Sequence, residues 1–273
     1  MYLTLPKKIF RLKHFLSRRN RAMSYYKDNL RLINRWAEKQ TEFSNYYYAL
    51  EDSNLKDLAG LISLIFDLDY YKVMAFIDEI NSDLPLKNHI KKFYSLNSGY
   101  RDSTSEYARR VGWYAVARII KPKIIVETGV SQGMGSCILS LALLKNSQEG
   151  FNGQYFGTDI DPNAGALYDT PYSDFGRILY GDSISSLKTL SFEIDLFIND
   201  SNHDSEYEYH EYEAIKPLLT SRTIILGDNS HISQSLREWS LLNDRKYVFF
   251  KEVPKEHWYP GAGIGISFSQ TRL

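Results

Sequence analysis

The sequence predicts an α/β protein: a doubly wound, mostly parallel sheet of seven strands with a helical N-terminal segment. Three observations support this prediction. Short apolar runs alternate with helical periodicity after residue 121, polar or glycine-rich turns follow the runs, and no helix separates the last two. Such alternation implies right-handed crossovers and a parallel sheet covered on both faces. The last two runs predict an antiparallel hairpin at one edge.

Length and composition favour one sizeable domain with an accessory segment. The chain has 273 residues, of which 43% are apolar and 24% charged. We expect a helical region over 1–110 and the sheet domain over 111–273. A single cysteine, Cys137, excludes a disulfide framework and a cysteine-rich zinc site. The longest apolar run, 58–66, is too short to span a membrane, and the start has no signal-type cleavage region, so a cytoplasmic protein is expected.

Charge is balanced overall but not along the chain. The formal net charge of zero argues against a general nucleic-acid binder. Residues 1–50, however, hold eleven Lys and Arg against three Asp and Glu, so they carry +8 and the remainder −8. Basic residues alternate there with Ile9, Phe10, Leu12, Phe15 and Leu16, which predicts an amphipathic helix. It either docks on the acidic body or contacts an anionic membrane surface or acidic substrate.

The remaining elements follow from periodicity and turn signals. Helices are expected over 26–50, 55–66, 71–80, 105–120, 136–144, after Pro162, 203–219 and 232–242. Strands are expected over 123–127, in the run ending at Asp159, and over 177–180, 194–198, 223–226, 247–250 and 263–268. In such sheets ligands collect at the carboxyl ends of the strands, so the loops after the strands hold the candidate site.

The loop after the first strand contains Glu127, Gly129, Ser131 and Gly133. Its glycines permit positive φ and let the backbone approach a ligand closely. The glycine spacing is GxxxGxG, whereas dinucleotide enzymes use GxGxxG. Taken alone, this loop is equally consistent with a turn that only reverses the chain.

Acidic residues follow the second and third strands. Asp159 is placed to accept hydrogen bonds from both hydroxyls of a ribose. Asp161, directly before Pro162, suits a helix cap instead. Asp182 follows the third strand, where a carboxylate fits beside an adenine edge.

Together these three loops resemble those of class I S-adenosylmethionine-dependent methyltransferases, over about residues 110–268. The resemblance implies a Rossmann-like sheet with S-adenosylmethionine as cofactor. It places the first loop along the methionine part of the cofactor, Asp159 on the ribose and Asp182 near adenine.

A second group of polar residues follows the fourth and fifth strands. Asp200, Asp228 and Asn229 bring three hard oxygen ligands to adjacent strand ends, which suits Mg²⁺. His203 follows Asp200 by three residues, in the expected first turn of the next helix. Each residue also has a structural alternative: a helix cap for Asp200, a turn for Asp228-Asn229 and a surface position for His203.

The pattern Asp200-x-x-His203 with Asp228-Asn229 is similar to that of metal-dependent O-methyltransferases, namely catechol O-methyltransferase and the macrocin-type sugar enzymes. That resemblance implies Asp200, Asp228 and Asn229 as metal ligands and His203 as general base. It also favours a sugar or glycoside acceptor. Two departures stand out: Ser201 replaces a frequent glycine, and Ser221-Arg222 replaces a glycine-rich turn.

The predicted function is therefore Mg²⁺-assisted methyl transfer to a hydroxyl of a small acceptor, with the helical N-terminal region covering the pocket or mediating homo-oligomerisation. Two alternatives stay open: a metal-free methyltransferase of the same fold, and a non-catalytic cofactor-binding protein that works through its basic N-terminal helices. His231 is a candidate supporting residue. The loop 256–261 is expected either to wall the substrate pocket or to cover the sheet edge.

Overall fold

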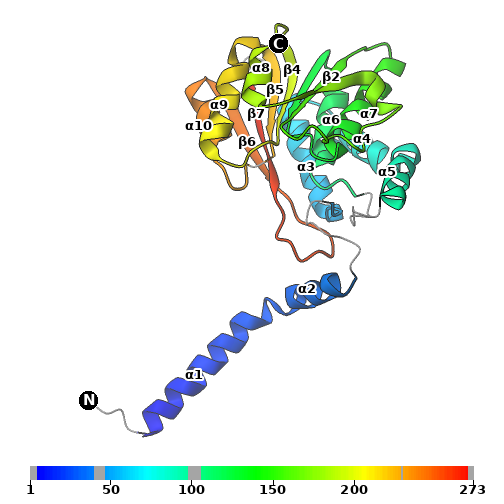
Figure 1. Ribbon diagram of the computed structural model, residues 1–273. Helices are drawn as coiled ribbons and strands as arrows, with labels where there is room; N and C mark the ends of the chain where they lie inside the picture. Colours follow the sequence, from blue (N-terminus) through cyan, green and yellow to red (C-terminus); the bar gives the residue numbers. More distant parts are fainter. Residues whose placement is uncertain (1–4, 40–46, 98–105, 229, 270–273) are drawn as a thin grey trace.

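A seven-stranded sheet forms the centre of the molecule (Figure 1). The computed structural model describes residues 5–39, 47–97, 106–228 and 230–269. The strand order is β3-β2-β1-β4-β5-β7-β6, with β7 antiparallel to both neighbours and β1 to β5 parallel. The strands are β1 Ile124–Thr128, β2 Gln154–Asp159, β3 Gly176–Tyr180, β4 Ile194–Asn199, β5 Leu219–Gly227, β6 Arg245–Lys251 and β7 Gly263–Ser269. The predicted fold class is confirmed.

Helices cover both faces of the sheet because successive strand side chains point to opposite sides. On β1, Ile125 joins the core beneath α3, α4, α6 and α7, whereas Val126 joins the core beneath α8, α9 and α10 (Figure 1). The first layer contains α3 Asp52–Phe66, α4 Tyr70–Ser82, α5 Leu84–Leu96, α6 Arg110–Ile120 and α7 Met134–Gln148. The second contains α8 Ser183–Lys188, α9 Ser205–Ile215 and α10 Ser235–Leu242. Short 3₁₀ turns lie at Tyr172–Phe175 and Lys216–Leu218.

Several helix boundaries differ from the sequence prediction. No helix follows Pro162; Asp161 instead accepts a hydrogen bond from the Asn163 backbone N–H (2.9 Å) and closes a turn. Expected helices 105–120, 203–219 and 232–242 are shorter, and α5 and α8 fall outside the expected set. Residues 47–51 are not helical, and residues 40–46 of the expected helix 26–50 lie outside the described part.

Two N-terminal helices, α1 Leu5–Ser24 and α2 Lys27–Lys39, form an arm that projects from the body (Figure 1). Helix α2 meets the β6–β7 loop, where Arg35 pairs with Glu256 (3.8 Å) and Trp36 packs on Trp258 (5.3 Å between ring centroids). The side chains of residues 7–24 in α1 are all exposed. The expected docking of this helix on the acidic body is therefore wrong for the described structure. Within the described residues, no helix combines the length and apolar character needed to cross a membrane.

Candidate active site

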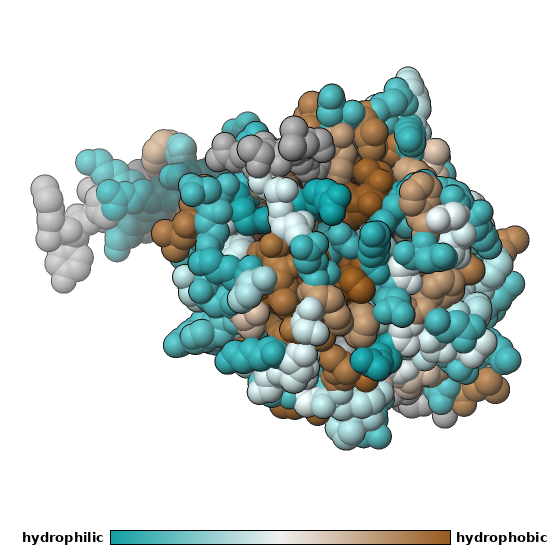
Figure 2. All heavy atoms as spheres, turned by 90° about the horizontal axis from the view of Figure 1, so that it is seen from above, coloured by the Kyte–Doolittle hydropathy of each residue, from teal (hydrophilic) through white to brown (hydrophobic). Residues whose placement is uncertain are grey.

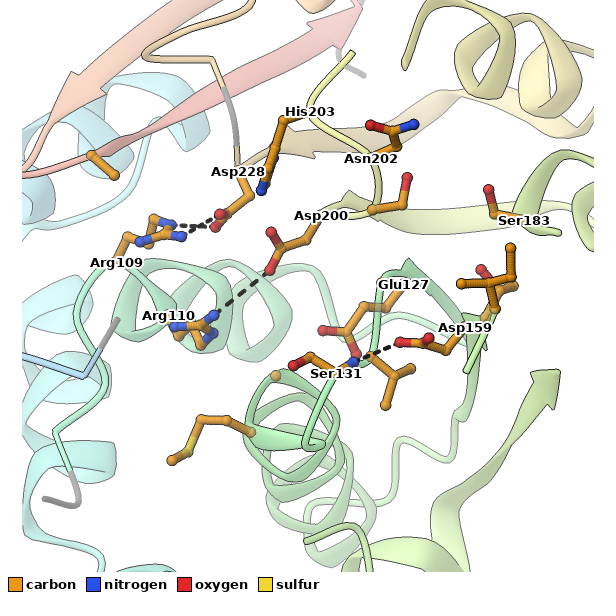
Figure 3. A pocket seen from close by; sticks show the side chains of 18 of the residues that line it. Arg109, Arg110, Glu127, Ser131, Asp159, Ser183, Asp200, Asn202, His203 and Asp228 are labelled. Atoms are coloured by element: carbon orange, nitrogen blue, oxygen red, sulfur yellow. Dashed lines mark hydrogen bonds and ion pairs between the residues drawn. The ribbon is translucent and has the colours of Figure 1, made fainter. Parts of the chain in front are cut away.

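A cavity of about 740 Å³ opens at the carboxyl ends of β1, β2, β4 and β5 (Figure 3). Eight of the predicted site residues line it: Glu127, Gly129, Ser131, Asp159, Asp182, Asp200, His203 and Asp228. Gly133 is not among the lining residues, and Asn229 lies outside the described part of the chain. The strand ends thus bring both predicted groups into one space.

Glu127, at the end of β1, is a buried carboxyl group on the cavity wall. It accepts hydrogen bonds from Ser136 Oγ (3.0 Å) and from the Tyr155 hydroxyl. Burial raises the pKa of Glu127 to about 7, although both hydrogen bonds oppose that rise. Gly135 makes room for this side chain, because a Cβ there would overlap the Glu127 carboxylate. Glu127 can therefore change charge near neutral pH.

The loop after β1 packs tightly against two other loops. Gly129 has φ +82°, and a Cβ at this position would collide with the backbone carbonyl of Asp200. The Ser131 backbone N–H donates to the Asp159 carboxylate (2.7 Å), which also accepts from the Asp161 N–H (2.9 Å). Asp159 is thus fixed at the end of β2. Gly133, at φ +99°, serves the turn into α7.

Asp182 both caps α8 and lines the cavity. Its carboxylate accepts from the Ser185 N–H (2.8 Å) and from the Tyr207 hydroxyl (2.7 Å). Hydrogen bonds from Ser185 and Tyr207 hold the pKa of Asp182 below its ordinary value. The carboxylate is therefore charged at neutral pH.

Two arginines at the start of α6 bind the carboxyl pair of the cavity. Arg109 contacts both oxygens of Asp228 through Nε and Nη2, and its Nη1 lies 3.6 Å from Glu252. Arg110 Nη2 lies 3.6 Å from Asp200 Oδ2 (Figure 3). Arg109, Asp228 and Glu252 are all buried. This arrangement is a bidentate guanidinium–carboxylate pair inside a larger charge cluster.

The pKa values of the two carboxyls in this cluster, Asp200 and Asp228, shift in opposite directions. Burial, followed by the nearby Asp228 charge, raises the pKa of Asp200 well above its ordinary value. Burial also acts on Asp228, but the charge and hydrogen bonds of Arg109 outweigh it and hold the pKa of Asp228 low. Proton binding to this coupled pair is thus favoured at Asp200 over Asp228.

The two described carboxyls of the predicted metal site, Asp200 and Asp228, contact arginines. Both Asp228 oxygens already bind Arg109, and Arg110 stands beside Asp200. Over residues 5–39, 47–97, 106–228 and 230–269, no cluster of three or more His, Cys, Asp or Glu side chains could hold a metal ion. The guanidinium groups thus occupy the cationic positions beside these carboxyls.

His203 lies in the loop before α9, so its predicted place in the first helical turn is wrong. Asp204 caps α9 by accepting from the backbone N–H groups of Glu206 (3.1 Å) and Tyr207 (3.0 Å). Because Asp204 takes the cap position, His203 precedes the helix. It is exposed, lines the cavity and points toward Asp228 (Figure 3).

His231 and Tyr259 lie on the acceptor side of the same cavity. The Tyr259 hydroxyl is 3.4 Å from His231 Nε2. Burial, with the charge of Arg109, lowers the pKa of His231, so its ring is neutral at pH 7. Because Tyr259 lines the cavity, it supports the first of the two predicted roles of the loop 256–261, namely forming a wall of the substrate pocket.

Residues 126–230 match the family model Methyltransf_24, described as a methyltransferase domain. This segment runs from β1 to just beyond β5 and contains the loops that place Glu127, Asp159, Asp182, Asp200 and Asp228. Residues 126–230 therefore form a methyltransferase domain. No curated protein matches its sequence.

Solved structures share the fold of this methyltransferase at low sequence identity. The O-methyltransferase TomG from Streptomyces achromogenes, in complex with S-adenosylmethionine, gives a TM-score of 0.52 at 15% identity, covering 68% of this chain and 90% of TomG. An O-methyltransferase from Bacillus cereus bound to S-adenosylhomocysteine gives 0.53 at 14% identity, covering 70% and 94%. The Podospora anserina methyltransferase PaMTH1, bound to S-adenosylhomocysteine, gives 0.50 at 20% identity, covering 68% and 88%.

The arginine pair is the part of the methyltransferase site that sequence reasoning missed. Arg109 and Arg110 lie 119 and 90 positions before their partners Asp228 and Asp200, outside every strand-end loop. One signal was available: two adjacent arginines begin a mostly apolar helix whose one further charged residue is Arg118. Buried charges of that kind need partners.

Proposed function

We propose that this methyltransferase moves the methyl group of S-adenosylmethionine to a hydroxyl oxygen of a small acceptor. One observation carries the proposal: the predicted cofactor loops and His203 line the same cavity. Two of the similar solved structures are named O-methyltransferases, which supports oxygen as the acceptor atom.

The cofactor half of the cavity suits a cationic ligand. Asp182 is charged, Asp159 is held by two backbone N–H groups, and Glu127 lies between them and the acceptor side. We assign the ribose to Asp159, the adenine edge to Asp182 and the methionine part to Glu127. These carboxylates favour the positive sulfonium of the cofactor over the neutral thioether of the product.

On the acceptor half, His203 is the proposed general base. The acceptor hydroxyl oxygen attacks the methyl carbon, the carbon–sulfur bond breaks, and its electron pair stays on sulfur. The hydroxyl proton passes to the His203 imidazole. His231, Tyr259 and Asp200 offer polar contacts to further hydroxyls, which supports a sugar or glycoside.

Mg²⁺ assistance, which the sequence resemblance implies, stays a prediction. The contacts of Arg109 and Arg110 support the metal-free alternative instead, because these cationic side chains already lie beside the two carboxyls. In a metal-free methyltransferase of this kind, Arg109 fixes Asp228, and side chains of the protein position the acceptor without a cation.

Methyl transfer is tested with isotopically labelled cofactor and a panel of sugars, glycosides and small phenols, with and without exhaustive chelation. The metal-free form predicts full turnover after chelation and no heat on titrating Mg²⁺ into the protein. Lost turnover after chelation, restored by Mg²⁺, would establish the cation-assisted form. Cofactor binding without label transfer to any acceptor would support the non-catalytic alternative.

A further inference from the structure

Helix α1 exposes an amphipathic surface with no partner among the described residues. Its Ile9, Phe10, Leu12, Phe15, Leu16 and Met23 side chains are between 39% and 65% exposed. Figure 2 shows hydrophilic and hydrophobic residues together on the surface of the projecting arm. So many exposed apolar side chains on one helix mark an interaction surface.

Part of the apolar and basic residues of α1 lie on opposite sides of the helix, while Lys8, Lys13 and Arg19 border the apolar side and Phe10 and Phe15 flank the basic side. Each residue turns an α-helix by about 100°. Ile9, Leu12 and Leu16 therefore share one face, whereas Lys7, Arg11 and Arg18 share the face across from it. The helix holds seven Lys and Arg residues and no Asp or Glu. An apolar stripe with basic residues opposite it and along its borders matches helices that lie in a membrane interface.

The charged residues of α1 favour one of the candidate partners of this surface over the others. Pairing α1 with α1 of a second copy along the apolar stripes would leave both basic faces without a partner, because neither helix holds an acidic residue. A nucleic acid would use the basic face but leave the apolar stripe exposed to water. An anionic lipid surface satisfies both faces at once, with phosphates beside the lysines and arginines and acyl chains beneath the leucines.

The arm is attached beside the cavity. Helix α2 contacts Glu256 and Trp258 of the β6–β7 loop, and Tyr259 of the same loop lines the cavity. In Figure 1 the arm leaves the body on the side of this loop. A surface that binds α1 is therefore held on the side of the molecule where the cavity lies.

We propose that α1 binds the protein to an anionic membrane surface, with its apolar stripe in the interface and its basic face among the lipid headgroups. Because its seven Lys and Arg residues make it too polar to cross the hydrocarbon core, the helix is laid along the surface. This function is independent of the acceptor assigned to the cavity, since it rests on α1 alone.

Flotation of the full chain with vesicles tests the proposal. Vesicles of phosphatidylcholine with about one-third phosphatidylglycerol should bind the protein at ~0.1 M salt, and much less at ~1 M, where the Debye length falls to about 3 Å. Pure phosphatidylcholine vesicles should bind it far more weakly. Absence of binding to the anionic vesicles at low salt overturns the proposal.

Two test variants, each with a matched control, examine the apolar and the basic residues of α1 separately. Leu12→Glu/Leu16→Glu should lower the partition coefficient of the protein onto vesicles by a factor of about a hundred or more. Each leucine buried in the membrane interface raises that coefficient about tenfold. The control, Leu64→Glu/Leu84→Glu, replaces more exposed leucines on α3 and α5 and should bind like the original.

The charge variant Lys7→Gln/Arg11→Gln/Arg18→Gln should weaken binding about a hundredfold, at roughly fivefold per charge. Lys56→Gln/Lys91→Gln/Lys92→Gln, on α3 and α5, is its control and should change little. Loss through charge variants alone would identify a general polyanion site and overturn the lipid proposal. Light scattering that shows an oligomer dissolved by Leu12→Glu/Leu16→Glu, without vesicle binding, would identify a second copy as the partner.

Discussion

The ionisation of Glu127 should link cofactor binding to pH. Its pKa in the cofactor-free protein is about 7, raised from an ordinary 4.5 chiefly by burial. S-Adenosylmethionine brings a sulfonium and an ammonium group, so a cofactor bound along this residue favours the ionised carboxylate. Binding near pH ~6 must therefore release nearly one proton per cofactor.

The expected magnitude follows from that linkage. If Glu127 is ionised throughout in the complex, affinity should rise roughly eightfold between pH ~6 and pH ~7.5. The range ends there because the cofactor's own ammonium begins to lose its proton at about 7.7–8.0. Titration calorimetry in two buffers of different ionisation enthalpy measures the affinity and the proton release together.

Glu127→Gln is the matched variant, because its carbonyl oxygen can still accept from Ser136 and Tyr155. It should bind the cofactor about tenfold or more weakly at pH ~7.5, and with no pH slope over this range. A slope retained by Glu127→Gln, or a flat profile in the original protein, would refute the assignment of Glu127 to the charged part of the cofactor.

The same ionisation should destabilise the cofactor-free fold. Below pH 4.5 the carboxyl is neutral in both folded and unfolded chains, whereas above about 7 the folded chain alone carries a buried charge. Stability should therefore fall as pH rises between these values, by up to about 3 kcal/mol. Glu127→Gln removes this term, so at pH ~8 it should melt at a higher temperature than the original protein, with the difference lost at acid pH.

Three further substitutions test other parts of the site. Asp159→Ala should weaken cofactor binding by roughly 1.5–3 kcal/mol, because a charged hydrogen-bond acceptor is lost; calorimetry should show no such loss for Asp161→Ala, which lies outside the cavity wall. His203→Gln should lower kcat by roughly 10²–10⁴-fold with cofactor affinity unchanged, and turnover equal to the original would leave it a surface residue. Gly129→Ala should destabilise the fold well beyond Gly150→Ala, which has a similar φ of +87° but open space around its Cβ position; equal losses in urea unfolding would contradict the close contact with the Asp200 loop.

The sheet could be predicted because local patterns determine it. β-Branched runs such as 124–126 end in turn residues, and the missing helix before β7 indicated the antiparallel edge. The helix boundaries were less accurate, since side-chain hydrogen bonds decide them. Asp204 takes the cap of α9 and Asp161 closes a turn instead of starting a helix, and each forms through contacts two or three residues away.

The cavity wall was predictable for a different reason. Glu127, Asp159, Asp182, Asp200 and Asp228 each follow a strand, and parallel strands end at the same edge of a sheet. Sequence reasoning could not supply what binds these carboxyls. Their partners come from the start of α6, which the packing of α6 against α7 brings to that edge, and no local pattern encodes such a long-range contact.

The buried charges at this edge are better explained by function than by stability. Removing a guanidinium and a carboxylate from water is expensive, and apolar residues of the same volume are often as stable. Yet Arg109 lies buried beside Asp228 and Glu252, and Arg110 beside Asp200, where the cavity would otherwise hold several carboxyls together. Arg109 holds the pKa of Asp228 low, whereas burial and the Asp228 charge raise the pKa of Asp200. Two neighbouring carboxyls with opposite pKa shifts thus stand opposite the cofactor loops, where the proposed acceptor would bind, and pKa values pushed apart in this way are typical of functional sites.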